Sequence, residues 1–213
     1  LVTANNAAPV VNAGPDRTAD EGERVTLSSL LGRGDNVIIG EDVPLLPTVS
    51  FTDAGTLDAH TATVDWGDGT ALEEAALSEF PFGPPGSTDG LTGFVLGEHV
   101  YADDGVYTVT VTVTDDDDGS HSDSFGITVQ NVAPVVRPSQ GQSGFEGDLV
   151  ELKDVFFFDA GTLDTHSGTV NWGDGTPTED LDIESEPFGP PGSLAGLLGS
   201  VHGSHVYADN GDY

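Results

Sequence analysis

The sequence predicts an all-β protein built from two β-sandwiches in tandem, and three observations support this prediction. The pentapeptide Trp-Gly-Asp-Gly-Thr occurs at residues 66–70 and again at 172–176. The peptide His-Val-Tyr-Ala-Asp occurs at 99–103 and at 205–209, with the same offset of 106 residues (172 − 66 and 205 − 99). A constant offset between unlike motifs indicates that a whole folding unit is duplicated. Next to the motifs, apolar residues alternate with polar ones, as in strands with one buried face.

The repeat boundaries follow from another duplicated peptide. Ala-Pro-Val-Val occurs at 8–11 and at 133–136, an offset of 125 residues (133 − 8). We therefore expect residues 1–6 to be the last strand of a preceding repeat, residues 7–131 to form one repeat and residues 132–213 to form the next.

The two repeats differ in length. Because the offset changes from 125 to 106, the first repeat carries a 19-residue insertion (125 − 106) near residues 28–50. We expect a surface excursion or an extra hairpin there. Its Arg33-Gly34-Asp35 tripeptide is interpreted as a plain turn. The second repeat reaches only Tyr213, the equivalent of Tyr107, so it is expected to be incomplete at its C-terminus and to lack its last two strands.

The first tryptophan motif ends a predicted strand. Ala62, Val64 and Trp66 alternate with threonine and aspartate. The Gly-Asp-Gly that follows predicts a turn, because glycine allows positive φ and aspartate can bond to its own backbone. The alternation predicts that Trp66 and its equivalent Trp172 are buried, although exposed tryptophans could stack on sugars.

Two segments after this turn are not expected to form strands. Glu73–Glu79 is acidic and indicates a helical turn. The peptide Pro-Phe-Gly-Pro-Pro-Gly-Ser at 81–87, repeated at 187–193, is too rich in proline and glycine for a regular central strand. We expect a rigid exposed loop that acts as a stiff connector, with an inter-domain or inter-subunit contact as the alternative.

A strong strand pattern follows the second motif. Valines alternate with threonines over 107–114, which predicts a long strand. Residues 124–129 predict a final strand, and the four aspartates at 115–118 are expected at the exposed tip of the hairpin between the two.

These motifs as an ordered set resemble the PKD domain, an immunoglobulin-like module. Residues 103–107 fit the Asp-x-Gly-x-Tyr pattern before strand F of immunoglobulin-like domains, whose tyrosine hydroxyl bonds back to the backbone. Val109 stands where an antibody domain has its cysteine, so the core is expected to close by packing alone. The resemblance implies tandem immunoglobulin-like β-sandwiches of about 100 residues each on secreted or surface proteins of bacterial style.

The resemblance also has implications for function. PKD modules are not enzymes in themselves. Some bind calcium near the domain junction, and some accompany secreted hydrolases as modules that contact the substrate.

Composition restricts the partners. Five basic residues against 37 acidic ones give a formal net charge of −32, which would repel a phosphate backbone or an anionic membrane surface. Bound cations or a saline medium would relieve the self-repulsion of such a chain, so the charge points to calcium or to high salt, with solubility alone as the alternative. The chain has no cysteine, which excludes disulfides and thiolate sites. No apolar run approaches the roughly 20 residues that span a bilayer.

Calcium is the expected cofactor, because it takes roughly six to eight hard oxygen ligands and the loops are rich in them. In the first repeat, looped acids, a junction asparagine and the corner before the long strand are expected to converge at one end of the sandwich. The candidate ligands there are Asp53 and Asp58, with Asn6 or Asp103 nearby. The matching set in the second repeat is Asp159, Asp164, Asn131 and Asp209. Solvated turn acids are the alternative interpretation.

The remaining polar residues do not predict an active site. Asp68 and Asp174 are expected to accept backbone N–H bonds within their turns, and no cleft is evident for a glycosidase pair. The six histidines include no His-x-x-x-His pair on a helix, so zinc is not expected. No serine lies in a nucleophile elbow.

We therefore expect a non-catalytic structural or adhesive segment of an extracellular, cell-surface repeat protein, forming a calcium-stiffened rod or a head-to-tail filament. The expected partners are neighbouring copies or adjacent repeats that complete each other's sandwiches by strand addition, with glycans as further candidates. Truncation is the competing explanation for the missing strands. The alternative function is an accessory module of a secreted hydrolase that binds polysaccharide or protein, and a third is a halophile's acidic surface with no specific ion role.

Overall fold

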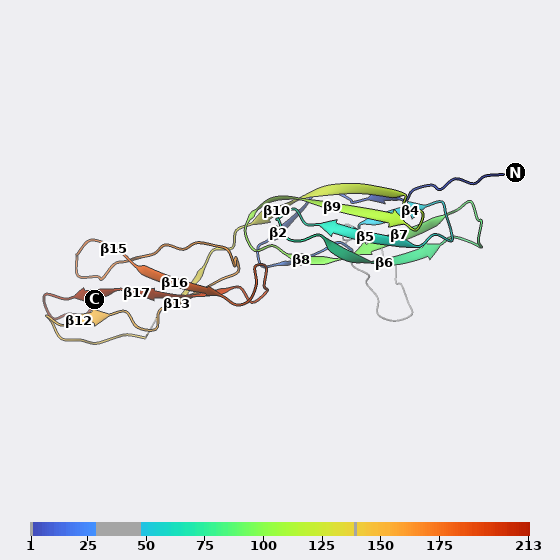
Figure 1. Ribbon diagram of the computed structural model, residues 1–213. Helices are drawn as coiled ribbons and strands as arrows, with labels where there is room; N and C mark the ends of the chain where they lie inside the picture. The colour runs from blue at the N-terminus through green and yellow to red at the C-terminus, as the bar shows by residue number, and fades with distance from the viewer. Residues whose placement is uncertain (1, 29–47, 139) are drawn as a thin grey trace, which may run out of the picture. The chain divides into compact units, whose positions relative to one another are not determined.

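A computed structural model describes residues 2–28, 48–138 and 140–213. All regular secondary structure in these ranges is β-strand (Figure 1). The predicted all-β fold is therefore confirmed. Most of the predicted insertion and the whole Arg33-Gly34-Asp35 tripeptide lie outside the described residues.

The chain divides into two compact units. The first unit comprises Leu1–Ala19, Arg24–His99 and Gly105–Val129, and the second comprises Asp20–Glu23, Val100–Asp104 and Gln130–Tyr213. Two short loops, 20–23 and 100–104, thus belong to the same unit as residues 130–213, which come later in the sequence. This membership matters below, because both loops carry acidic side chains.

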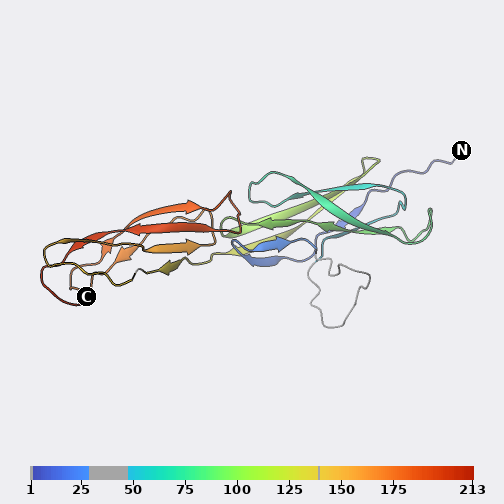
Figure 2. The same cartoon turned by 90° about the horizontal axis from the view of Figure 1, so that it is seen from below.

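The strands of the first unit form one sheet in the order β1-β4-β7-β6-β5-β9-β10-β2, in which the neighbours from β1 to β10 pair antiparallel, together with a separate β3–β8 pair (Figures 1 and 2). Their bounds are β1 Val10–Asn12, β2 Arg17–Asp20, β3 Arg24–Thr26, β4 Ser50–Asp53, β5 His60–Asp65, β6 Glu73–Pro81, β7 Leu91–Leu96, β8 Glu98–Val100, β9 Gly105–Asp115 and β10 Ser120–Gln130.

Strand β6 corrects one prediction, because the acidic segment Glu73–Glu79 is a strand and forms no helical turn. Its first residues, Glu73–Ala75, pair with β5, and residues 76–81 pair with β7. This backbone pairing, with Ala75 and Leu77 half-buried, outweighs the helix preference of glutamate and alanine. The loop that follows, from Phe82 to Gly90, is irregular and mostly exposed, as predicted.

Strand β1 lies at one end of the ladder, and side chains of β10 cover part of its free edge. The Val11 N–H donates to His121 Nδ1 (3.2 Å), and the Ala13 N–H donates to Asp123 Oδ2 (3.0 Å). These bonds connect the β1 edge to β10, which is far from it in the strand order, and satisfy donors that an open edge would expose to another chain.

The core of the first unit lies on the inward faces of these strands. Val109, Val111 and Val113 on β9 are fully buried, while the threonines between them are half-buried. The predicted valine–threonine strand is therefore confirmed, and β10 extends the predicted final strand. Trp66 is 1% exposed and Trp172 is 6% exposed, which confirms that both tryptophans are core residues.

The second unit holds shorter strands in three sheets: β11-β13-β17-β16, β12-β18 and β14-β15. Phe157, Leu197 and Val201 form its main cluster, with Val155, Leu181 and Ile183 packed against it. The strand bounds are β11 Val135–Arg137, β12 Leu149–Glu151, β13 Phe156–Asp159, β14 Thr169–Val170, β15 Glu179–Asp180, β16 Asp182–Pro187, β17 Leu197–His202 and β18 Ser204–Val206.

Two packing details recur in the sequence repeats. Phe51 and Gly93 are register partners in β4 and β7, and a Cβ on Gly93 would lie 2.1 Å from the Phe51 ring. Phe157 and Gly199 repeat this contact, also at 2.1 Å. The predicted tyrosine corner is seen at Tyr213, whose hydroxyl donates to the Asp209 carbonyl (2.9 Å).

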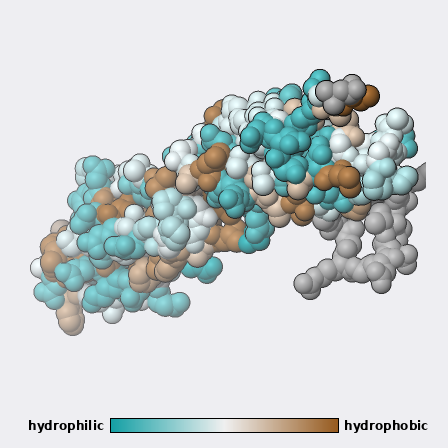
Figure 3. Space-filling view, turned by 45° about the vertical axis from the view of Figure 1, so that its right-hand side comes forward, coloured by the Kyte–Doolittle hydropathy of each residue, from teal (hydrophilic) through white to brown (hydrophobic). Residues whose placement is uncertain are grey.

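Hydrophilic residues cover much of the visible face, with hydrophobic residues in smaller groups among them (Figure 3). The described residues contain no helix long and apolar enough to cross a membrane.

Candidate functional site

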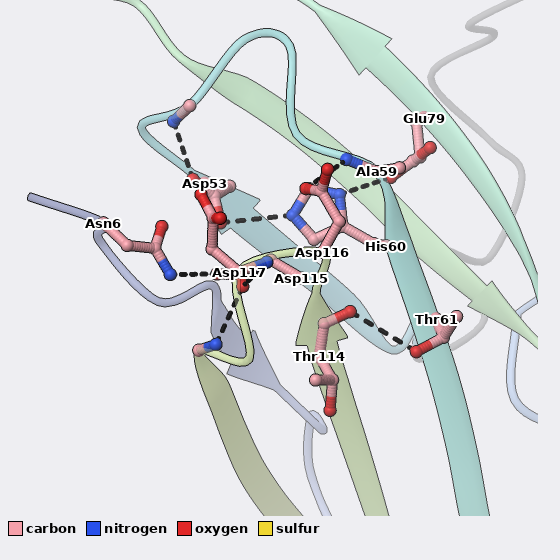
Figure 4. A network of polar contacts seen from close by, with 12 residues as sticks. Asn6, Asp53, Ala59, His60, Thr61, Glu79, Thr114, Asp115, Asp116 and Asp117 are labelled. Atoms are coloured by element: carbon pink, nitrogen blue, oxygen red, sulfur yellow. Dashed lines mark hydrogen bonds and ion pairs between the residues drawn. The ribbon is translucent and has the colours of Figure 1, made fainter.

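Three carboxylates meet where strands β4 and β9 end. Asp53 is the last residue of β4, Asp115 is the last residue of β9, and Asp58 lies on the loop that leads into β5. One oxygen of each lies within 4.8 Å of the others. Asp53 and Asp115 are both 5% exposed. Together with Asn6, these residues are called the first-unit acidic site, of which Figure 4 shows Asn6, Asp53 and Asp115.

Asn6 joins this site through Asp115. Its Nδ2 donates to Asp115 Oδ2 (2.9 Å). The other oxygen of Asp115 accepts the Gly119 N–H (2.8 Å) and the Asp117 N–H (3.0 Å). The hydrogen bond from Asn6, followed by those backbone donors, lowers the pKa of Asp115, so this carboxylate stays ionised.

The pKa of Asp58 shifts in the opposite direction. Burial raises the pKa of Asp58, and the neighbouring charges of Asp53, Asp116, Asp115 and Asp117 raise it further. The site therefore concentrates negative charge that its own hydrogen bonds only partly offset.

His60 lies beside the site between two carboxylates. Its Nε2 is 3.1 Å from Asp53 Oδ2 and its Nδ1 is 2.7 Å from Glu79 Oε1 (Figure 4). The His60 side chain is fully buried. An imidazolium donates from both nitrogens and would satisfy both contacts. No role for His60 was predicted from the sequence, although a histidine recurs at the same repeat position as His166 and this recurrence was an available signal.

The second unit repeats part of this geometry. Asp159, Asp164 and His166 have ligand atoms within 4.8 Å of one another, and His166 Nε2 lies 2.8 Å from Asp159 Oδ2. Burial, together with the charges of Asp159 and Asp103, raises the pKa of Asp164, while His166 opposes this shift.

Another acidic group in the second unit consists of Glu21, Asp103 and Asp104, whose ligand oxygens also lie within 4.8 Å of one another. Asp103 therefore does not join Asp53 and Asp58, which corrects the alternative that placed it with them. The cause is the loop 100–104, which packs in the second unit while Asp53 lies in the first. Glu21 was not among the ligands predicted from the sequence, although its recurrence as Glu146 was an available signal.

The other predicted ligands of the second repeat lie apart from one another. Asn131 is exposed and sits between Gln130 and Val132, both of which bond to Glu21. Asp209 accepts the Asn210 N–H and contributes to the electrostatic environment of Tyr213. Among the described residues, Asp209 belongs to none of the groups of histidine, aspartate and glutamate that could hold a metal ion.

Asp68 and Asp174 are structural, as predicted, but each also binds a histidine. Asp68 accepts the Thr70 N–H (3.0 Å) and contacts His99 Nε2 (2.8 Å). The His99 ring stacks on Trp66 with 4.9 Å between centroids. Asp174, His205 and Trp172 repeat this arrangement. The hydrogen bonds from Thr176 and His205 lower the pKa of Asp174 to about 2, so its carboxylate remains ionised at all but strongly acidic pH.

The buried Glu21 predicts a pH dependence in cation-free buffer. Burial raises the pKa of Glu21 to about 6 from 4.5; the Val132 N–H opposes the shift and nearby aspartates add to it. Because the folded pKa is raised, the protonated form favours folding, and stability is lost as pH rises from about 4.5 through about 6. Relative to Glu21→Gln, the wild type should lose about 2 kcal/mol between pH 4.5 and pH 7.5. Urea unfolding at both pH values measures this; a constant difference between the two proteins would contradict it.

Comparison with known proteins identifies a family. A family model described as PKD domain matches residues 32–129. No curated protein matches the chain.

Proposed function

Because residues 32–129 form a PKD domain, a non-catalytic immunoglobulin-like module, we propose that the chain is a structural segment of an extracellular protein, ordered by calcium at the first-unit acidic site. PKD domains typically occur in extracellular proteins with structural, adhesive or binding roles. A tandem array of such repeats, joined end to end or between copies as a rod or filament, is the larger assembly that we propose.

The observation that carries the calcium proposal is the convergence of Asp53, Asp58 and Asp115 with the Asn6 side chain. The three aspartates supply hard oxygen atoms, the ligand type that calcium prefers, and the Asn6 side chain is hydrogen-bonded to Asp115 beside them. Calcium also tolerates the irregular geometry of loops. Backbone carbonyls or solvent would supply the rest of the roughly six to eight ligands. A bound divalent cation would also offset the charge that raises the pKa of Asp58.

Calcium at this site would connect three segments that are distant in the sequence. Asn6 belongs to an N-terminal stretch without strand structure, Asp58 to the β4–β5 loop, and Asp115 to the β9–β10 turn. A ligand that binds only the folded state adds about 2.7 kcal/mol of stability at a free concentration of about 100 Kd. Binding would therefore resist opening of the N-terminal segment, which is the property that a load-bearing repeat requires.

The test compares calcium binding by the wild type, Asp115→Asn and Glu74→Gln. Glu74 is exposed on β6 and provides the same change of net charge away from the site. Asp115→Asn should weaken calcium binding by about tenfold or more, because it removes a charged ligand. Glu74→Gln should change it less than about twofold, since surface charges interact weakly. NMR titration of the Asp117 and Gly119 amides, which donate to Asp115, reports this site directly.

Two results would contradict the proposal. One is an equal response of these amides in wild type and Asp115→Asn. The other is an equal response to sodium chloride at matched ionic strength, which would indicate an acidic surface that only requires screening.

One observation favours the alternative function of a substrate-binding module. Val135, Phe158 and Leu198 are register neighbours across β11, β13 and β17 in the second unit, and they are 58%, 41% and 40% exposed. The first unit has Thr52 and Thr92 at the positions equivalent to Phe158 and Leu198. Co-sedimentation with an insoluble polysaccharide, reduced by Phe158→Thr, would support the alternative; equal sedimentation of the two proteins would oppose a binding role for this row.

A further inference from the structure

The loop 20–23 is held in the second unit by its backbone. The Glu21 N–H donates to the Gln130 carbonyl (3.0 Å), and the Gly22 N–H donates to the Tyr101 carbonyl (3.1 Å). A Cβ on Gly22 would lie 2.9 Å from Ala160 Cβ, so this loop also packs closely against the start of the 160–164 loop. These contacts fix the backbone that carries the Glu21 side chain.

Glu21 is an acid buried without full compensation. Glu21 is 1% exposed, and its Oε1 accepts the Val132 N–H (2.6 Å). Oε2 is buried and has no hydrogen-bond partner among the described residues. A buried, unpaired carboxylate oxygen is costly, because it has lost water and gained nothing in exchange.

Further acids lie near the Glu21 carboxylate on two other loops of the same unit. The Asp103 and Asp104 side chains each bring an oxygen within 4.8 Å of Glu21. The Leu163 N–H donates to the Ala102 carbonyl (3.2 Å), which places Asp164 beside the 100–104 loop. The negative charges of Asp164, Asp159 and Asp104 all act on Glu21. Of these acids, Asp159 has His166 as an ion-pair partner (2.8 Å).

We propose that Glu21, Asp103 and Asp104 form a second divalent-cation site, distinct from the first-unit acidic site, with Asp164 facing it from the third loop. The unpartnered Glu21 Oε2 is the central ligand, and calcium is the ion that fits the donor set, because all the donors are carboxylate oxygens on loops. The ion joins the loops 20–23, 100–104 and 159–164, which have few regular strand contacts to hold them together.

The test is a calcium titration of the full chain followed by NMR of the Val132 and Gly22 amides. Val132 donates to Glu21, and Gly22 is its neighbour, so both report this site, while Asp117 and Gly119 report the first-unit site. Calcium should shift the Val132 and Gly22 resonances in the wild type and in Asp115→Asn. This independence separates a failure of the present proposal from a failure of the first-unit site.

Three variants complete the experiment. Glu21→Gln should weaken the calcium response of Val132 by about tenfold or more. Glu146→Gln is the matched control, because Glu146 occupies the same repeat position (21 + 125) but is exposed, and its response should stay within about twofold of the wild type. Asp104→Asn, at an exposed position, should weaken binding by itself, so the test holds even if Glu21→Gln fails to fold.

The proposal is overturned if calcium up to about 10 mM leaves the Val132 and Gly22 amides unshifted, since extracellular calcium modules bind with Kd values of roughly 0.1–1 mM. It is also overturned if Asp104→Asn responds as the wild type does, or if sodium chloride at equal ionic strength produces the same shifts.

Discussion

Replacing Trp66 with alanine is expected to lower the free energy of unfolding of the first unit by about 3–5 kcal/mol, the usual cost of removing a buried tryptophan. Trp66 is 1% exposed and directly follows β5, and the His99 ring stacks on it. The variant loses this packing and leaves a cavity that the long β9 strand cannot close. For a domain whose total stability is about 5–15 kcal/mol, this is a large fraction.

Urea unfolding of the full chain measures the effect. In Trp66→Ala, Trp172 is the remaining tryptophan, so its fluorescence follows the second unit while circular dichroism follows both units. Trp172→Ala is the matched comparison and should cost less, because Trp172 is 6% exposed and packs in a unit with a smaller buried cluster. Equal unfolding midpoints for Trp66→Ala and wild type would show that this side chain does not organise the core.

Replacing Gly93 with valine is expected to destabilise the first unit by about 3 kcal/mol, although valine is the better strand former. The Phe51 ring occupies the space over Gly93, and a Cβ there would lie 2.1 Å from a ring carbon. Phe51 is itself 1% exposed, so the ring has no room to move away without disturbing its neighbours.

A double-mutant cycle identifies this clash as the cause. Phe51→Ala removes the ring, so adding Gly93→Val to it should cost far less than in the wild type. Gly141→Ala is the control, because a Cβ at Gly141 meets nothing within 4 Å and should leave the unfolding midpoint unchanged within error. Strict additivity of the Phe51 and Gly93 effects would refute the explanation.

The local pattern was sufficient for most of the first unit. Alternation of valine with threonine predicts β9 because every second side chain of a strand faces the core, and that rule depends on no distant residue. The same rule failed at β6, where acids dominate the segment. Strand β6 forms because β5 and β7 supply backbone partners, and those partners lie outside any short window of sequence.

The metal candidates were only partly predictable for a related reason. Repeat spacing identified Asp53 and Asp58 as acids on one loop, and the structure adds Asp115 from a hairpin interpreted as an exposed tip. Asp103 was grouped with the wrong acids, because its position along the repeat does not reveal which unit its loop packs against.

The sequence by itself determined the all-β class, the duplicated motifs, the burial of both tryptophans and the structural role of Asp68 and Asp174, because these depend on local periodicity and turn chemistry. The tertiary structure alone decided which carboxylates meet. Glu21 is separated from Asp103 by more than eighty positions in the chain (103 − 21), and only the packing of their two loops brings their charges together and leaves one buried oxygen without a partner.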